Sequence, residues 1–455
     1  MILRKRKLLL VASLLIIIFT YYFWVYRNRT AYGLDDYVSI AEYFDKKEEF
    51  ANAIKFYKKT LALDQNNLLA HAGLAKIYFN LEKYEKSLEH FKKVYSLQPN
   101  IAKLLFKMGF IYYYKMGDLD NAIKVTQEYI KHQDDNYNAH IILQDCYFKK
   151  GDFAQALQHA KRIEEIWFTK GTAKNIDKEW DGADLSGKTI LLRDNVGIGD
   201  IFCWARYAKH MKKQGAKVML ETRSFLIPIL SKCPYLDGFV SRGERLPDFD
   251  CQVLVGQMPL YFVKNQEDMT LKTPYMHADS RLVTLWKKRF ARDKNFKVGI
   301  CWDPCVYKDK AGEVIKNKRA VPLCLFSSLA HLDNITFYSL QQVNGVGQLN
   351  SVPKHFKIKT FDQDFDKKYG SFMDTAAVMK NLDLVITADT SIAHLAGAMG
   401  VDVWVLLPLV ADWRWLSDEH TTVLYPTMRL FRQKKLGDWE PVVNNVYYEL
   451  RKLIS

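Results

Sequence analysis

The sequence predicts an α plus α/β protein with three parts: an apolar N-terminal helix, an α-solenoid of helical repeats, and a double Rossmann-like region. An uncharged run opens the chain, small residues then recur at a repeat period, and short β-rich runs later alternate with helical stretches. The chain has 455 residues, which is enough for several domains, and its 49% hydrophobic and 26% charged residues are typical of globular proteins.

Residues 1–30 are predicted to form a membrane anchor. Leu8 to Val25 is a run of 18 uncharged, mostly apolar positions. At about 1.5 Å per residue, such a helix nearly spans a hydrocarbon core of about 30 Å. A cleavable signal peptide is the alternative, but it needs a shorter apolar core and small residues at the cut, and the stretch after Thr20 is bulky and then basic. We therefore expect one uncleaved transmembrane helix.

Residues 34–168 show an internal repeat. Small residues recur at spacings of 34, 35 and 34, namely Ala53, Ser87, Ala122 and Ala156. This pattern resembles tetratricopeptide repeats (TPR), and it predicts about four helix–turn–helix units with small residues where the helices cross closely. Such arrays present a concave surface for peptides or proteins. The alternative, equally open here, is an array that packs on the next domain or dimerises.

Beyond the repeats, residues 169–187 form a connector rich in turn residues. Residues 188–281 and 282–455 then each alternate strand-like and helix-like runs, which predicts parallel sheets. Two such sheets leave a cleft between their carboxyl edges, where ligands bind in open α/β sheets.

Two loops at predicted strand ends are candidate site segments. In the first, Gly197 and Gly199 allow a tight turn into a helix that begins near Asp200. That carboxylate either stabilises the helix start or faces the cleft as a general base. In the second, Asp389, Thr390 and Ser391 precede a helix, and they either cap it or help its amides to hold a diphosphate.

The C-terminal motifs resemble the heptosyltransferase family of GT-B glycosyltransferases. They are the segments Asp389 to Val405, Ala411 to Leu416, Leu430 to Gln433 and Gly437 to Trp439, together with the Gly197–Asp200 loop. The resemblance spans about residues 188–450, and with the repeats it describes a TPR array fused to a family 9-like GT-B domain. It implies an inverting glycosyltransferase of the hexosyl- or heptosyltransferase type, which uses an NDP-sugar and needs neither a cofactor nor a metal.

The resemblance also implies roles for individual residues. Asp200 matches the catalytic acidic position, and Gly197 and Gly199 belong to its loop. The donor and its phosphates would contact residues that match family positions, namely Arg319, Gln341, Asp389, Thr390, Ser391 and His394. Asp362, Asp364 and Asp366 alternate like metal ligands, but an exposed edge or loop is the expectation for them, and no metal site is predicted.

The net charge of +15 does not indicate a nucleic-acid binder, because Lys and Arg are spread along the chain. The main hypothesis is a membrane-anchored enzyme that acts on a glycan, lipid-linked or protein acceptor recruited by the repeats. The alternative is a non-catalytic TPR scaffold with a degenerate GT-B module. The orientation of the anchor has two indications. Four basic residues precede it and two follow it closely, which weakly favours a cytoplasmic N-terminus with the rest of the chain outside the cytoplasm. Nucleotide sugars are cytoplasmic in bacteria, which favours a cytoplasm-facing catalytic domain.

Overall fold

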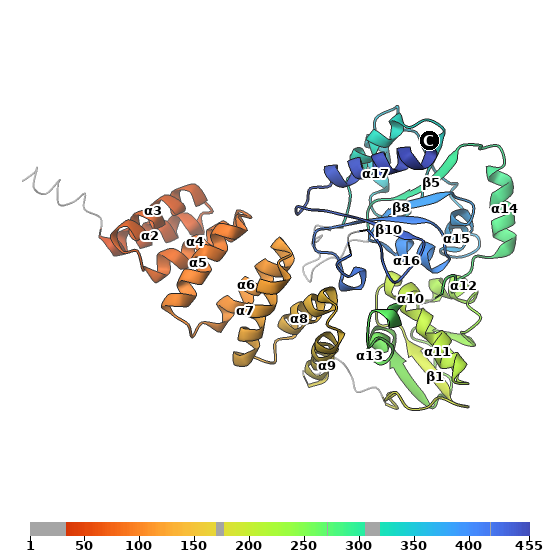
Figure 1. Cartoon of the computed structure of the whole chain (residues 1–455), viewed down its shortest axis with the longest axis horizontal. Coiled ribbons are helices and arrows are strands. Elements are labelled where there is room, and N and C mark those ends of the chain that lie inside the picture. Colours follow the sequence, from red (N-terminus) through yellow and green to blue (C-terminus); the bar gives the residue numbers. More distant parts are fainter. Residues whose placement is uncertain (1–32, 170–176, 271, 305–318, 419) are drawn as a thin grey trace, which may run out of the picture. The chain divides into compact units, whose positions relative to one another are not determined.

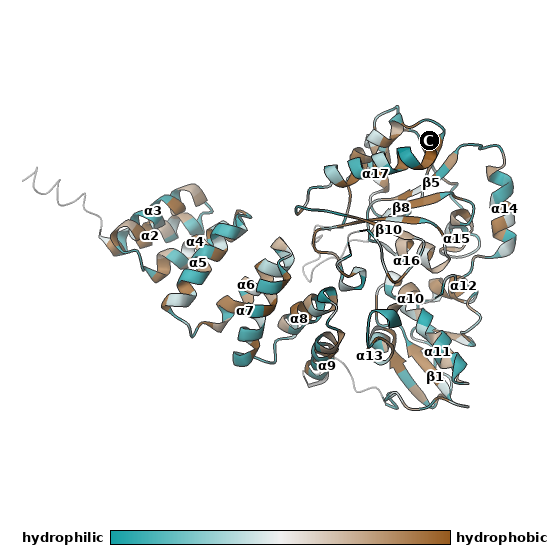
Figure 2. Cartoon of the chain, in the orientation of Figure 1, coloured by the Kyte–Doolittle hydropathy of each residue, from teal (hydrophilic) through white to brown (hydrophobic). Residues whose placement is uncertain are grey.

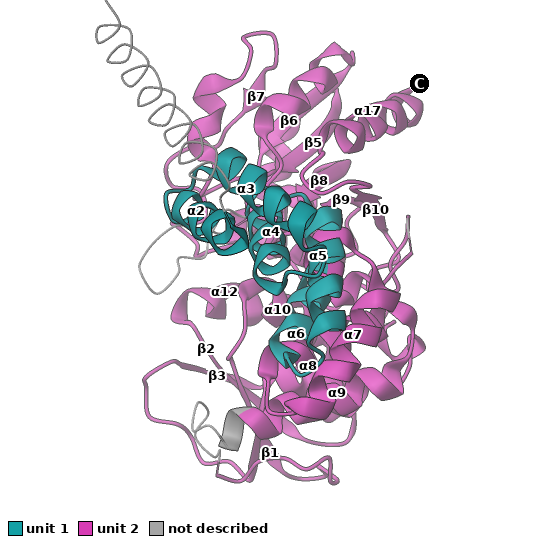
Figure 3. Cartoon of the chain, turned by 90° about the vertical axis from the view of Figure 1, so that its left-hand side faces the viewer, with its two compact units in different colours: residues 1–111 teal, residues 112–455 magenta. Residues whose placement is uncertain are grey.

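The computed structural model describes residues 33–169, 177–270, 272–304, 319–418 and 420–455. The anchor predicted over residues 1–30 lies outside these ranges, as does most of the segment after Trp302. Within them, every helix is too short or too polar to cross a membrane. The chain divides into two compact units, residues 1–111 and 112–455 (Figure 3).

The described part of the first unit consists of consecutive helices. These are α2 (Leu34–Lys46), α3 (Phe50–Leu63), α4 (Leu68–Asn80), α5 (Tyr84–Leu97) and α6 (Ala102–Ile111). Ala53, one of the repeating small residues, is fully buried between helices. Tyr57 and Leu74 pack with it in one hydrophobic core, so larger side chains fill the space beside the small one.

The second unit begins with further repeat helices. These are a short π-helical turn (Tyr112–Met116), α7 (Leu119–His132), α8 (Tyr137–Lys150) and α9 (Phe153–Thr169). Asn136 caps α8 by accepting hydrogen bonds from the amides of Asn138 and Ala139 at 3.0 and 3.2 Å. The buried side chains of α8 and the start of α9 belong to the same hydrophobic core as the following sheet. The end of the array and the α/β region therefore fold as one body.

A buried histidine pair recurs in the array. In the first unit, His71 and His90 meet through their Nδ1 atoms at 2.8 Å, and in the second unit His140 and His159 do so at 3.0 Å. The Nε2 atom of His140 contacts the carbonyl of Asp134 at 2.8 Å, and because a carbonyl only accepts, this nitrogen carries the proton. Nδ1 of His140 is then the acceptor, and His159 donates to it. Each pair ties the two helices of one repeat together.

Two parallel sheets make up the α/β region (Figure 1). The first has the order β3-β2-β1-β4, with β1 Thr189–Arg193, β2 Lys217–Thr222, β3 Gly238–Ser241 and β4 Cys251–Leu254. The second has the order β10-β9-β8-β5-β6-β7, with β5 Phe296–Cys301, β6 Ile335–Ser339, β7 Ile358–Lys359, β8 Leu384–Ala388, β9 Val403–Leu407 and β10 Met428–Arg432. Strand β7, at the edge of the second sheet, has only two residues.

Helices cover both sheets. They are α10 (Ile198–Trp204), α11 (Ala208–Lys213), α12 (Ile227–Leu230), α13 (Met258–Phe262), α14 (Ser280–Phe290), α15 (Met373–Met379), α16 (Ser391–Ala398) and α17 (Glu440–Ile454). Single 3₁₀ turns lie at 205–207, 224–226, 255–257, 267–269 and 413–415, and longer ones at 323–331 and 346–351. Strands β8 and β9 are buried along their whole length, and Figure 2 shows β8 as mostly hydrophobic. Helices α10 and α16 pack on each other where the two sheets meet (Figure 1).

Candidate active site

A cavity of about 920 Å³ opens where the loops after several strands converge. Its walls come from the segments after β1, β5, β6 and β8 and from the 3₁₀ turn Trp413–Trp415 with its flanking residues. This is the carboxyl edge of parallel sheets, where helix N-termini and exposed backbone amides gather. The cavity is within the size range of small-molecule and cofactor sites.

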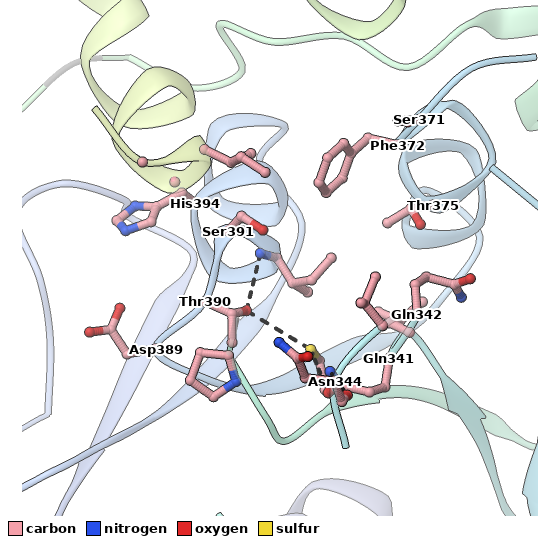
Figure 4. Close-up of a pocket in the computed structure, with 18 of the residues that line it drawn as sticks. Gln341, Gln342, Asn344, Ser371, Phe372, Thr375, Asp389, Thr390, Ser391 and His394 are labelled. Atoms are coloured by element: carbon pink, nitrogen blue, oxygen red, sulfur yellow. Dashed lines mark hydrogen bonds between the residues drawn. The ribbon is translucent and has the colours of Figure 1, made fainter. Parts of the chain in front are cut away.

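The loop after β8 presents the N-terminus of α16 to this cavity. Thr390 has extended backbone angles and caps the helix, because its Oγ1 accepts a hydrogen bond from the amide of Ile392 at 3.1 Å. Oγ1 of Thr387 lies 3.0 Å from the same hydroxyl and fixes its orientation. Figure 4 shows Thr390 and Ser391 at the helix start, with His394 further along the same helix. A positive helix end with two hydroxyls suits an anion.

The loop after β1 brings Asp200 to the same place. Oδ2 of Asp200 accepts a hydrogen bond from the amide of Gly197 at 3.1 Å, which closes the first turn of α10. Oδ1 accepts a hydrogen bond from Nη1 of Arg414. The carboxylate therefore does both things considered for it, because it stabilises a helix start and also lies on the cavity wall. About a quarter of its side chain stays exposed.

Gly199 is required by the close approach of two helices. A Cβ at this position would lie 2.8 Å from Cδ2 of His394 and 3.5 Å from the Cα atom of Ser391. A larger residue would therefore clash with the His394 ring, and that ring cannot easily move because it is stacked on Trp415. The glycine thus allows the Asp200 loop and the α16 N-terminus to meet.

Arg414 links the two halves of the cleft. Its Nε and Nη2 donate to the two carboxylate oxygens of Asp412 at 2.7 and 3.0 Å, while Nη1 reaches Asp200. Burial raises the pKa of Asp412, but the charge and hydrogen bonds of Arg414 outweigh it and lower that pKa to about 2. In the sequence, Asp412 and Arg414 belong only to the motif Ala411 to Leu416, which carries part of the family resemblance. The pairing of Arg414 with a carboxylate 214 positions away has no signal in a single sequence.

Arg319 faces Asp389, with Nη1 of the arginine 3.6 Å from Oδ2 of the carboxylate. Asp389 is almost completely buried, and burial raises the pKa of its carboxyl while Arg319 opposes the shift. Both residues line the cavity. The structure thus brings together Arg319 and Asp389, two of the residues predicted for the donor site. Their contact places the guanidinium beside the loop that leads into α16.

The Gln341 side chain is bonded to its own surroundings. Oε1 accepts hydrogen bonds from the amides of Trp302 and Asp303, both at 3.0 Å. Nε2 donates to the carbonyls of Asp303 and Asn344 at 2.7 and 2.6 Å. Gln341 therefore holds together the two loops that follow β5 and β6. Its expected contact with a nucleoside stays a prediction, and this bonding leaves the amide little spare capacity for one.

His394 lies in the site as a neutral residue. Its Nδ1 lies 2.9 Å from the hydroxyl of Tyr425, and only 4% of the residue is exposed. Burial and then the nearby guanidinium of Arg414 hold the pKa of His394 well below its usual range. At neutral pH the imidazole is therefore uncharged, and it acts through hydrogen bonding and packing.

The alternating carboxylates of residues 362–366 do not converge. Asp362 pairs with Arg289 at 3.3 Å, whereas Asp366 accepts a hydrogen bond from the amide of Thr375 at 3.0 Å. In the part of the chain that the structure describes, no three His, Cys, Asp or Glu side chains are grouped so as to hold a metal ion.

Comparisons with known proteins add the following. Tetratricopeptide repeat models match residues 68–101 and 108–167. The chain is 22% identical over 291 residues to protein FlbA of Caulobacter vibrioides, covering 60% of this chain and 48% of FlbA. It is 27% identical over 131 residues to the TPR repeat-containing protein MJ1428 of Methanocaldococcus jannaschii, covering 29% of this chain and 23% of that protein. The chain thus spans about half of the first relative and a quarter of the second.

Among solved structures, the ADP-heptose LPS heptosyltransferase II of E. coli matches with a TM-score of 0.42 and 12% identity, over 58% of this chain and 98% of that one. The family models confirm the tetratricopeptide repeats that the residue spacing predicts, and an α/β region of two parallel sheets follows them.

Proposed function

We propose that this protein is an inverting, metal-independent glycosyltransferase that transfers a sugar from an NDP-sugar to a glycan, lipid-linked or protein acceptor. The observation that carries the proposal is the meeting, in one cavity, of a carboxylate and an anion-binding helix end. Asp200 lies on one wall, and the hydroxyl-capped N-terminus of α16 with Arg319 lies on another. Glycosyl transfer needs a base for the acceptor and positive charge for the leaving diphosphate.

The reaction follows from that placement. The acceptor hydroxyl attacks the anomeric carbon, and its proton passes to the carboxylate of Asp200. A carboxylate has about four lone-pair positions, so the bonds to Gly197 and Arg414 leave room for this proton. The bond from the anomeric carbon to the diphosphate oxygen breaks, and the nucleoside diphosphate leaves with the electron pair. Its charge is then balanced by the α16 amides and the Arg319 guanidinium.

The test begins with binding. Thermal unfolding of the protein is followed with ADP, GDP, UDP and CDP and their sugar derivatives, and one nucleotide at about 100 times its dissociation constant should stabilise the protein by about 2.7 kcal/mol. That nucleotide's sugars are then used to measure transfer or donor hydrolysis. Asp200→Asn should lower turnover by about 10²-fold or more and keep nucleotide affinity. The exposed Asp333→Asn serves as the matched control.

A well-folded protein that binds none of these nucleotides would contradict the proposal. It would favour the alternative, a non-catalytic TPR scaffold. If Asp200→Asn has unchanged turnover, Asp200 is not the base, but the proposal that the protein is a glycosyltransferase still stands.

The repeats and the N-terminal segment complete the proposal. Tetratricopeptide repeats bind proteins or peptides, so the array is proposed to recruit the acceptor or a partner. The apolar residues 8–25 are proposed to anchor the chain in a membrane, with the catalytic region facing the cytoplasm where nucleotide sugars occur. The test is a C-terminal fusion to a reporter that is active only outside the cytoplasm. We expect this reporter to be inactive. An active reporter would show that the catalytic region faces the opposite side of the membrane.

A further inference from the structure

A stack of aromatic rings runs from the TPR array to the cleft. Phe148, at the end of α8, stacks on Trp413 with ring centroids 4.1 Å apart and planes inclined by 19°. Trp413 stacks in turn on Trp204 of α10, at 5.7 Å and 13°. The guanidinium carbon of Arg414 lies 5.6 Å from the centre of the Trp204 ring. One array side chain thus supports the turn from which Arg414 reaches Asp200.

A partly buried cluster of polar side chains, from α8 and the π-helical turn, adds a second connection. Nζ of Lys149 donates to the hydroxyl of Tyr113 at 2.9 Å, and that hydroxyl donates to Asp145 at 2.8 Å. The carbonyl of Lys149 accepts a hydrogen bond from Ser417 Oγ at 2.6 Å, which ties α8 to the end of the same turn. The Lys149 charge also lowers the pKa of Asp412, although burial and Arg414 affect that pKa more strongly.

The array itself shows which of these residues the repeat requires. Phe79 and Tyr84 in α4 and α5 occupy the positions of Phe148 and Phe153, and both pairs pack edge to face, at 6.0 and 5.5 Å. An aromatic residue at this position is therefore part of the repeat. The next position is Lys46, Asn80, Lys115 and Lys149 in the four repeats. A lysine there is therefore common in the array, and Lys149 differs from the others in what it contacts.

We propose that Phe148 and Lys149 are positioning residues of the transfer site: they fix the Asp412–Arg414 turn, and through it the carboxylate of Asp200. The last repeat then supports the catalytic site from outside the cavity, in addition to the recruiting role proposed for the array. This inference rests on the proposed glycosyltransferase function. Neither residue lines the main cavity, so both act on the rate of the chemical step rather than on donor affinity.

The test uses the full chain and two sets of matched variants. Phe148→Leu removes the ring but keeps an apolar side chain, and Phe79→Leu makes the same change at the equivalent repeat position. Lys149→Met removes the partly buried charge, Lys149→Arg restores a cation, and Lys150→Met changes the exposed neighbour that pairs with Asp120. Each protein is measured for binding of the nucleoside diphosphate selected from ADP, GDP, UDP and CDP, for turnover of the matching NDP-sugar, and for thermal stability.

Phe148→Leu and Lys149→Met should lower kcat by about 10-fold, because a small misplacement of a catalytic group is costly. Their nucleotide affinity should stay within about threefold of wild type, with Lys149→Arg recovering most of the rate. Phe79→Leu and Lys150→Met should behave as wild type in both measurements. If Phe148→Leu is too unstable to assay, the lysine series decides alone.

The inference is overturned if Phe148→Leu and Lys149→Met both keep wild-type kcat. It is also overturned if their kcat falls no further than that of the controls Phe79→Leu and Lys150→Met. It is also overturned if nucleotide affinity falls as much as the rate, since that indicates a general loss of structure. A wild-type protein that neither binds nor turns over any nucleotide would refute the proposed function itself. The two failures are therefore distinguishable.

Discussion

Arg206 gives the sharpest test of how the α/β region is held together. This arginine is completely buried on the 3₁₀ turn after α10. Its guanidinium donates to the carbonyls of Cys203, Met269 and Leu424 at 2.7, 3.1 and 3.1 Å, and to the hydroxyl of Tyr275 at 2.9 Å. Leu424, the partner furthest along the chain, lies 218 residues from Arg206, so one side chain joins segments of both halves of the α/β region.

Replacing Arg206 with Met removes the guanidinium donor from three buried carbonyls, at a cost of about 1–3 kcal/mol for each one left unpaired. Some regain partners by local movement, and Met fills much of the volume. We therefore expect a loss of about 3–5 kcal/mol in the free energy of unfolding. Arg206→Lys restores one cation and three donors but not the planar fork, and it should lose about half as much.

The assay is urea unfolding followed by tryptophan fluorescence. All tryptophans except Trp24 lie beyond residue 111, so the signal reports mainly on the second unit. Arg281→Met, at an exposed position on α14, is the control and should change little. The reasoning is refuted if Arg206→Met unfolds within 1 kcal/mol of wild type, or if Arg206→Lys is the less stable of the two.

Two further predictions concern the array and the cleft. Burial and the neighbouring His140 lower the pKa of His159 from 6.5 to about 4, so the folded state favours the neutral ring. The stability that this neutral ring contributes, about 3 kcal/mol, is complete above pH 6.5 and should be lost as the pH falls towards 4. His159→Asn keeps a donor without titrating, so urea unfolding at pH 7.5 and 4.5 should show a smaller pH effect, and an unchanged one would contradict the assignment. Gly199→Ala places a Cβ against His394 and should cost about 1–3 kcal/mol and reduce nucleotide affinity, whereas a wild-type melting temperature would mean that the helices separate easily.

Periodic features of the sequence were sufficient to predict the array. A small residue every 34 or 35 positions reports a local helix crossing, and the structure buries Ala53 and Ala156 completely at such crossings. The matching repeat models confirm this prediction. The strand–loop–helix around Thr390 was predictable for a related reason, because a buried strand followed by capping residues is a local pattern.

The arrangement of charges in the cleft is not local, and no single sequence contains it. Asp200 is one of many acidic residues at a helix start, and its pairing with Arg414 depends on how two sheets meet. The same limit applies to His394, whose motif implies a role in the site. Its neutral state follows only from burial and from Arg414, which are properties of the assembled fold.

The end of the array shows how a repeat acquires a function that its own pattern does not require. At the position of Phe148, the repeat needs an aromatic ring to pack on the next helix, and Phe79 does this within the first unit. In the second unit the other face of Phe148 is covered by Trp413, so the packing that the repeat requires also supports the cleft. Lysines occupy the position of Lys149 in two other repeats, Lys46 and Lys115, so the residue type is common in the array. Lys149 is partly buried, which carries a desolvation cost. Its contacts with Tyr113 and Ser417 are therefore best explained by the surface against which α8 packs, and that surface is the outside of the turn that carries Arg414.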